Sequence, residues 1–265
     1  MNGEHAHEPI FARFSRAAAS YHPRARVQTQ VADALLRLIE PGPPPDRVLE
    51  IGCGTGVLTE RVLARWPAVR VDALDASEGM LARMRERFAG LERLRCMAGD
   101  VRTFVPERPY PVVFSSSALH WVFPVRDAVA GLRRLLARRG QAVLALMLDG
   151  TLCELHAVRR DIAPGKRPPT SLPSEPEVRE ALRSTGLTLE TAQTAILREP
   201  HASAADFLQS LRLRGVTAGP VSVGAAPLAR GELRRVIAEY QRRHAAADGT
   251  VHASYHVLYV RARFA

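Results

Sequence analysis

The sequence predicts an α/β fold, a doubly wound and mostly parallel seven-stranded sheet with an added helical cap. Short apolar runs alternate with helical patterns over residues 47–148, the order expected of βαβ units in a parallel sheet. A glycine-rich stretch directly follows the first of these runs, at 52–56. A run rich in valine and tyrosine closes the chain at 252–264, and such residues favour strands. These three observations carry the prediction.

Each expected element follows from local pattern. The first part, 1–45, predicts a helical cap segment with helices around 11–21 and 25–40, because apolar residues recur there at helical spacing. A proline-rich linker at 41–46 separates it from the main domain, 46–265. Strands are expected at 47–51, 69–74, 94–99, 111–116, 141–148, 187–197 and 252–264, and helices at about 57–65, 77–88, 125–137, 177–185, 203–214 and 230–243. The stretch at about 198–245 is predicted to be a helical lid insertion.

Composition narrows the class of protein. The formal net charge is +10, yet Lys166 is the only lysine, so the excess of arginine indicates either an acidic partner or a base-composition bias. No window resembles a membrane span and the start does not resemble a secretory signal, so we expect a cytoplasmic protein. Cys53, Cys96 and Cys153 form neither a metal-binding spacing nor a disulfide framework.

The stretch VLEIGCGTG at 48–56 predicts the ligand. Gly52, Gly54 and Gly56 alternate, one residue short of the G-x-G-x-x-G spacing of dinucleotide-binding loops. Glu50 ends the strand before this loop. A carboxylate there would repel a pyrophosphate but would suit a positively charged ligand. S-adenosylmethionine carries a sulfonium and an ammonium and has no phosphate, so we expect it as the cofactor.

Two further acids support this interpretation. Asp75 ends the second expected strand, where a carboxylate accepts hydrogen bonds from both hydroxyls of a ribose. Asp100 follows the third strand and could accept from an adenine amino group. The structural alternative for each acid is a helix cap.

The motifs VLEIGCGTG, LDAS (74–77) and AGDV (98–101) together resemble those of the class I S-adenosylmethionine-dependent methyltransferases, which have a Rossmann-like fold. The resemblance covers roughly residues 46–150. It implies that the glycines face the methionine part of the cofactor and that SSSALHWV (115–122) forms a wall for cofactor and substrate. With Glu50, the cofactor-binding residues it implies are Gly52, Gly54, Gly56, Asp75, Ala76, Met80, Asp100, Val101 and Ser116.

The flanking segments are similar to the malonyl-[acyl-carrier-protein] O-methyltransferases of biotin synthesis. FSRAAASYHPRARVQTQVADALL (14–36), LDGTLCELHAV (148–158) and ASYHVLY (253–259) match in order, so the resemblance covers nearly the whole chain. It implies methyl transfer to the free carboxylate of a malonyl thioester, with acyl carrier protein as the partner. His120 departs from the family, which usually has glutamine there, and KRPPTSLPS (166–174) is poorly matched.

The implied chemistry suggests four catalytic candidates. A malonyl carboxylate is ionised at neutral pH and is already a nucleophile, so no general base is needed. An arginine suits the carboxylate best, and Arg212 and Arg214 near the expected lid are the candidates. Tyr21 could close over the cofactor or simply pack, and His120 could shape the transfer wall or be a structural histidine. Surface solvation is the alternative for either arginine alone.

Other functions remain open from the sequence. The first is a methyltransferase acting on another small carboxylic acid or metabolite, and less favoured ones are a nucleic-acid methyltransferase and a non-catalytic binding protein. The sequence shows no nucleic-acid module, and we expect neither a nucleic-acid nor a membrane partner. An acidic carrier protein would be steered by Arg212, Arg214, Arg234 and Arg235.

Overall fold

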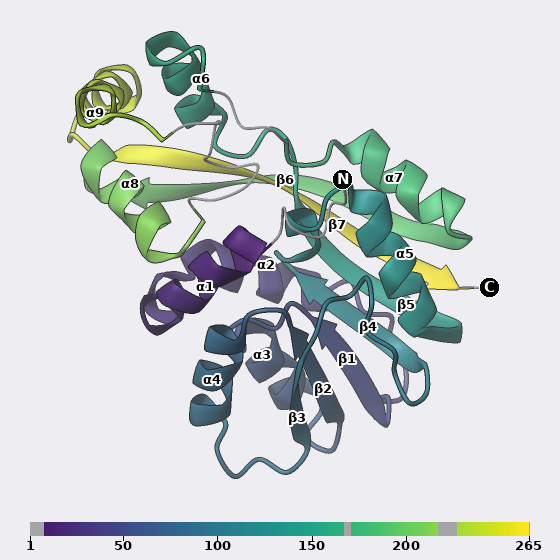
Figure 1. The fold of residues 1–265 in the computed structure, drawn as a ribbon. Helices are drawn as coiled ribbons and strands as arrows, with labels where there is room; N and C mark the ends of the chain where they lie inside the picture. Colours follow the sequence, from purple (N-terminus) through teal and green to yellow (C-terminus); the bar gives the residue numbers. More distant parts are fainter. Residues whose placement is uncertain (1–7, 167–170, 217–226, 265) are drawn as a thin grey trace.

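The computed structural model describes residues 8–166, 171–216 and 227–264. Within them the chain forms one seven-stranded sheet in the order β3-β2-β1-β4-β5-β7-β6 (Figure 1). Strands β1 to β5 run parallel, and β7 is antiparallel to both β5 and β6. The strands are β1 Arg47–Ile51, β2 Arg70–Asp75, β3 Leu94–Ala98, β4 Tyr110–Ser116, β5 Leu136–Met147, β6 Leu187–His201 and β7 Val251–Phe264. The predicted fold class is confirmed.

Helices cover both faces of the sheet, because neighbouring residues of a strand point to opposite sides. In β1, Val48 packs in one apolar cluster with α2 and α3, whereas Leu49 packs in a second cluster with α5 and α7. Both side chains are fully buried, as expected for a central parallel strand. The helices are α1 Glu8–Tyr21, η1 His22–Arg24, α2 Arg26–Leu36, α3 Val57–Arg65, α4 Glu78–Arg87, η2 Leu119–Trp121, α5 Val125–Leu135, α6 Cys153–Ile162, α7 Glu175–Ser184, α8 Ala204–Leu213 and α9 Arg230–His244.

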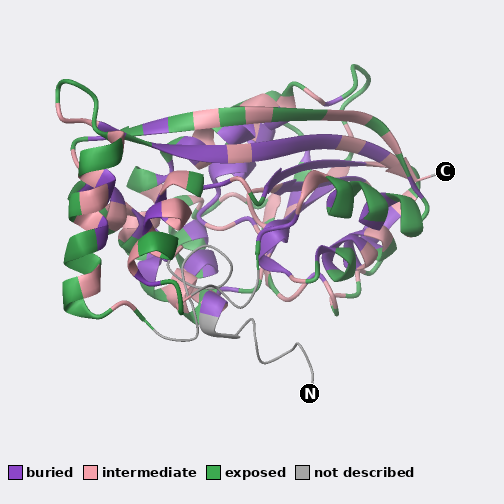
Figure 2. Ribbon diagram, turned by 90° about the horizontal axis from the view of Figure 1, so that it is seen from above, coloured by how far each residue is buried: buried purple, intermediate pink, exposed green. Residues whose placement is uncertain are grey.

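The last two strands differ from the parallel ones. Along β6 most side chains are exposed or half-buried, whereas β7 beside it is mostly buried (Figure 2). This pattern fits an edge strand with one solvated face. The two strands pair along almost their whole length, so they form a long ribbon that carries α8 and α9 at one end.

The two N-terminal helices occupy different places. Helix α2 packs against α3 and the sheet, and its apolar residues belong to the main core. Helix α1 instead lies between α4 and α8 (Figure 1). The Ser15 hydroxyl is 2.8 Å from that of Ser77, and Ser20 Oγ donates to the Leu213 carbonyl at 2.6 Å. Of the two, α1 is therefore the helix that joins the β2–α4 end of the sheet to α8, and a capping role for residues 1–45 stays a prediction.

Several element boundaries differ from those expected. Helix α7 begins at Glu175, two residues earlier, because Ser174 and Glu177 form a capping box. Strand β5 begins at Leu136 rather than at 141, and α6 was not expected from the pattern. Residues 217–226 of the predicted lid insertion, and 167–170 of the poorly matched segment, lie outside the described residues. In the part of the chain that is described, no helix combines the length and apolarity needed to cross a membrane.

Candidate active site

A cavity of about 1100 Å³, counted to its open mouth, lies at the carboxyl ends of the five parallel strands. This is where doubly wound sheets bind ligands, and the space suits a cofactor together with part of a substrate. Ten of the predicted site residues line it: Tyr21, Gly52, Gly54, Asp75, Ala76, Met80, Asp100, Val101, His120 and Arg214. Four do not: Glu50, Gly56, Ser116 and Arg212.

Two glycines of the loop at 52–56 lie so close to other residues that a side chain would collide with them. A Cβ on Gly52 would stand 2.1 Å from the Cβ of Ala118, so no side chain fits there. Gly56 has a φ of +86°, and a Cβ would stand 2.5 Å from Phe88 Cε2. Gly56 is thus required to turn the chain into α3 and does not line the cavity, and its implied contact with the cofactor stays a prediction.

Asp75 is held in place by backbone donors. Its Oδ2 accepts from the Gly54 N–H at 2.7 Å, and its Oδ1 accepts from the Ser77 N–H at 2.8 Å. Burial raises the pKa of Asp75 to about 6, although these two N–H groups oppose the shift. The cap of α4 is Ser77, whose hydroxyl accepts from Met80 N–H. Asp75 is therefore not the helix cap that was its structural alternative.

Glu50 lies behind the loop and not in the cavity wall. Its side chain is 2% exposed, and its Oε2 accepts a hydrogen bond from Thr59 Oγ1 in α3 at 2.5 Å. Burial raises the pKa of Glu50 to about 8; the Thr59 hydroxyl opposes this and the nearby Asp75 adds to it. The expected acid is present at the strand end, but it does not touch the cavity.

Asp100 lines the cavity and also forms an ion pair with Arg102. Arg102 Nη2 lies 2.6 Å from Asp100 Oδ2, and the Arg102 N–H donates to Oδ1 at 2.8 Å. An adenine amino group that donates a hydrogen bond to Asp100 would share this carboxylate with Arg102. Val101 beside it is buried.

The cofactor side of the cavity fits S-adenosylmethionine. Glu50 and Asp75 have no ion pair with any cationic side chain in the described residues, so the local acidity favours a positively charged ligand. Two buried wall atoms, Gln28 Oε1 and Ser117 Oγ, have no hydrogen-bond partner among those residues. Such atoms are costly to leave unpaired, and a ligand with amino and hydroxyl donors would satisfy them. Among the described residues no cluster of three metal-ligating side chains occurs.

The structure separates the two arginine candidates. Arg214, which ends α8, is 1% exposed and lines the cavity, whereas Arg212 is exposed to solvent. Arg212 is two positions away on the helix and points elsewhere, so it is not placed to hold a substrate. Arg214 also cannot steer a partner from the surface, as the charge pattern had suggested.

Tyr21 and His120 line the same cavity as neutral groups. Burial raises the pKa of Tyr21 to about 12; the nearby Arg214 opposes this shift and Asp75 adds to it. Burial lowers the pKa of His120 to about 3. His120 Nδ1 accepts the Met147 N–H at 3.2 Å, which leaves Nε2 as the donor of the ring. Neither group exchanges a proton near neutral pH.

Several wall residues were missed by the sequence reasoning. Gln28 lies on the polar side of a helix expected only to cap, and Ser117 follows the named Ser116 but has the strained φ of +55°. Tyr255 also lines the cavity and was expected only as part of a strand. Ser117 is the one with a sequence signal, since it lies in the segment that the resemblance marked as a wall.

Comparison with known proteins agrees with this geometry. Residues 48–140 match the family model described as a methyltransferase domain. The malonyl-[acyl-carrier protein] O-methyltransferase of Geobacter sulfurreducens is 32% identical over 254 residues, covering 93% of this chain and 94% of the relative.

Solved structures share the fold. The YcgJ protein from Bacillus subtilis aligns with a TM-score of 0.63 at 17% identity, covering 89% of this chain and 98% of that one. Geranyl diphosphate C-methyltransferase from Streptomyces coelicolor, solved with S-adenosyl-L-homocysteine, aligns with a TM-score of 0.56 at 16% identity, covering 91% and 80%.

The glycine loop, the acids at adjacent strand ends, the strand order and a relative matched along nearly its full length converge on one assignment. The chain is an S-adenosylmethionine-dependent O-methyltransferase of the class I fold and belongs to the malonyl-[acyl-carrier protein] O-methyltransferase family.

Proposed function

We propose that this enzyme methylates the free carboxylate of a malonyl group carried as a thioester on acyl carrier protein, a step in the synthesis of a biotin precursor. The observation that carries the proposal is Arg214, a fully buried arginine in the wall of the cavity. Its Nη1 has no hydrogen bond with a described residue, whereas Nη2 donates to three side chains and Nε to a backbone carbonyl. A buried guanidinium with a free edge suits a carboxylate.

Different residues would hold the cofactor and orient the substrate. When bound, S-adenosylmethionine supplies an electrophilic methyl group on its sulfonium. Asp75 and the glycine loop would hold the cofactor, and Arg214 would orient the malonyl carboxylate toward it. Tyr21 lies near both Asp75 and Arg214, so its hydroxyl would sit between the two ligands. The rate advantage would come mainly from alignment and exclusion of water.

No residue has to act as a base. The malonyl carboxylate is ionised near neutral pH, and methylation removes no proton from it. His120 and Tyr21 keep their neutral forms there, in agreement with a reaction that needs no proton transfer. The methyl ester is neutral, so it would lose its ion pair with Arg214 and leave more readily.

A carrier protein as partner is supported by the relatives, which are malonyl-[acyl-carrier protein] O-methyltransferases, and by exposed charge. Arg212, Arg234 and Arg235 are exposed and have no ion pair within the described residues. With Arg214 excluded by burial, these three remain from the set proposed for steering an acidic partner.

A substrate panel tests the proposal. The enzyme is incubated with labelled S-adenosylmethionine and, separately, malonyl-carrier protein, acetyl-carrier protein, malonyl-coenzyme A and free malonate. We expect the malonyl-carrier protein to be methylated with the highest kcat/KM and the acetyl form not at all. Preferred methylation of a free dicarboxylic acid would instead support the small-acid alternative, and no methylation of any carboxylate would contradict the proposal.

A further inference from the structure

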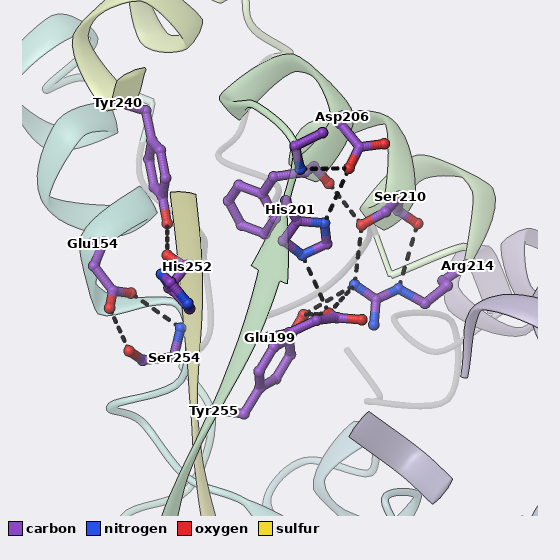
Figure 3. A network of polar contacts seen from close by, with 12 residues as sticks. Glu154, Glu199, His201, Asp206, Ser210, Arg214, Tyr240, His252, Ser254 and Tyr255 are labelled. Atoms are coloured by element: carbon purple, nitrogen blue, oxygen red, sulfur yellow. Dashed lines mark hydrogen bonds and ion pairs between the residues drawn. The ribbon is translucent and has the colours of Figure 1, made fainter. Parts of the chain in front are cut away.

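Arg214 is held from behind by a polar network on the β6–β7 ribbon (Figure 3). Strand pairing sets Glu199 opposite Ala253 and Leu197 opposite Tyr255. Glu199 and Tyr255 are therefore diagonal neighbours on adjacent strands, and both reach the end of α8. Tyr255 Oη donates to Glu199 Oε2 at 3.0 Å.

Among the described residues, the hydrogen bonds of the guanidinium all lie on its Nε–Nη2 edge. Nη2 donates to Glu199 Oε2 at 3.0 Å, to the Tyr255 hydroxyl at 2.9 Å and to Ser210 Oγ at 3.2 Å. Nε donates to the Ser210 carbonyl at 3.4 Å. The remaining nitrogen, Nη1, has no hydrogen bond with any residue that the structure describes. The network fixes the guanidinium plane and leaves the Nη1 side for a ligand.

The network also balances the charge of Arg214 before any substrate arrives. Glu199 is 5% exposed. Burial alone would raise the pKa of Glu199. His201, whose Nε2 lies 3.3 Å from Glu199 Oε2, and Arg214 outweigh this effect, so the pKa of Glu199 lies below its ordinary value. Burial alone would lower the pKa of Arg214, but Tyr255 and Glu199 outweigh it and raise the pKa. The two residues thus form an ionised, buried pair.

Charge is lost in the methyl transfer itself. A bond forms between a carboxylate oxygen and the methyl carbon, the carbon–sulfur bond breaks, and its electron pair stays on sulfur. The negative carboxylate and the positive sulfonium both become neutral. A full cation beside the carboxylate would therefore stabilise the ground state more than the transition state, which slows the chemical step. A cation already balanced by a carboxylate would orient the substrate with less of this penalty.

We propose that Glu199 is a positioning residue that holds Arg214 by its Nε–Nη2 edge and reduces the positive charge that Arg214 presents to the substrate. This inference rests on the proposed function, because it takes a carboxylate as the ligand of Arg214. It assigns a role in turnover to a residue that lies behind the cavity wall and does not touch the substrate.

The test is Glu199→Gln, which keeps an oxygen acceptor for Arg214 and Tyr255 but removes the charge. Affinity for malonyl-pantetheine is measured by calorimetry with S-adenosylhomocysteine bound, and kcat with the labelled cofactor. We expect affinity to rise about threefold to tenfold and kcat to fall by about tenfold, since ground-state binding gains while the transition state does not. Affinity for the neutral methyl ester should not change. Glu190→Gln, on the same strand but paired with Arg261 and Arg263, is the matched control and should leave both values unchanged.

Weaker binding of malonyl-pantetheine by Glu199→Gln, or an unchanged kcat, would overturn the inference. If that variant does not fold, Tyr255→Phe decides, because it removes a neutral member of the network. We expect it to lower kcat several-fold without tightening malonyl binding, and an unchanged kcat would show that the network does not position Arg214. Arg214→Gln separates the two claims. If it retains full turnover, Arg214 does not orient the substrate and the inference fails, although the proposed activity stands. Loss of turnover in Arg214→Gln without the split in Glu199→Gln refutes only the role of Glu199. The proposed function itself fails only if the wild type methylates no malonyl substrate.

Discussion

The two sides of the cavity differ in whether a buried carboxyl group has a cationic side chain as its partner. At the ends of β1 and β2, Glu50 and Asp75 are acids without a cationic side chain as partner among the described residues, and burial raises the pKa of both. At the end of α8, Arg214 is buried together with its counter-ion Glu199. One side lacks a positive charge, and the other is neutral as a pair.

The difference indicates what each side binds. An acidic site without a cation is completed by a ligand that brings positive charge, as S-adenosylmethionine does. A balanced pair with one free guanidinium edge gains less from an incoming anion, but it orients that anion well. We infer that the β1–β2 side supplies affinity for the cofactor and that the α8–ribbon side supplies alignment of the substrate. Four variants or conditions test this division.

Removing Arg214 should have the largest effect. Arg214→Gln takes away the carboxylate contact and leaves Glu199 buried without its cation, so we expect kcat/KM for malonyl-carrier protein to fall about 100-fold to 1000-fold, with a loss of stability of about 3 kcal/mol or more. Arg212→Gln, at an exposed position two residues earlier, is the control. With malonyl-pantetheine as the substrate, for which steering of a carrier protein plays no part, it should stay within about twofold of the wild type, whereas Arg214→Gln should lose turnover there too. Steady-state kinetics and thermal unfolding measure both. Equal losses in the two variants would contradict the assignment.

On the other side, Asp75→Ala should weaken S-adenosylhomocysteine binding by about 1.5–3 kcal/mol, the scale of hydrogen bonds to a charged group. Calorimetry measures this directly. Asp72→Asn is the control, since Asp72 lies on the same strand and accepts instead from the Tyr110 hydroxyl. An unchanged affinity in Asp75→Ala would remove this residue from the cofactor site.

Glu50 makes the stability of the ligand-free enzyme depend on pH. Its folded pKa, about 8, lies above the ordinary value of 4.5. The folded state therefore favours the protonated acid, and stability is greatest below pH 4.5 and falls as pH rises toward 8. Glu50→Gln cannot ionise. Between pH 4.5 and 7, we expect the free energy of unfolding of Glu50→Gln to fall by about 3 kcal/mol less than that of the wild type. We also expect its affinity for the cofactor to fall. Denaturant unfolding across this range gives the comparison, and parallel curves for the two proteins would contradict the account.

The smallest expected effect concerns the outer surface. Reversing Arg234 and Arg235 to glutamate should lower kcat/KM for malonyl-carrier protein by roughly tenfold at low salt and leave malonyl-pantetheine unaffected, because steering between exposed charges is long-range. Added salt should act on the wild type in the same selective way. The control reverses Arg65 and Arg70, which are also exposed but lie away from the cavity end of the sheet. Identical salt dependence for both substrates would favour a compositional origin of the charge.

The sequence predicted the cofactor side better than the substrate side for a physical reason. The glycine loop and Asp75 lie on consecutive βα units, so short-range pattern places them together. Arg212 and Arg214 occupy one helical turn, and only the packing of α8 decides which one is buried. Glu199 and Tyr255 meet Arg214 through strand pairing between distant segments, which local pattern does not contain. Helix α2 packs its apolar face into the main core, and its position before the linker does not indicate this packing.

One crossed binding experiment tests the division between the two sides most directly. The affinities for S-adenosylhomocysteine and for malonyl-pantetheine are each measured by calorimetry in the wild type, Asp75→Ala and Arg214→Gln. We expect Asp75→Ala to lose about tenfold or more of its affinity for S-adenosylhomocysteine alone, and Arg214→Gln to lose a similar factor for malonyl-pantetheine alone. If either substitution weakens both ligands equally, the two sides do not act separately and the account is wrong.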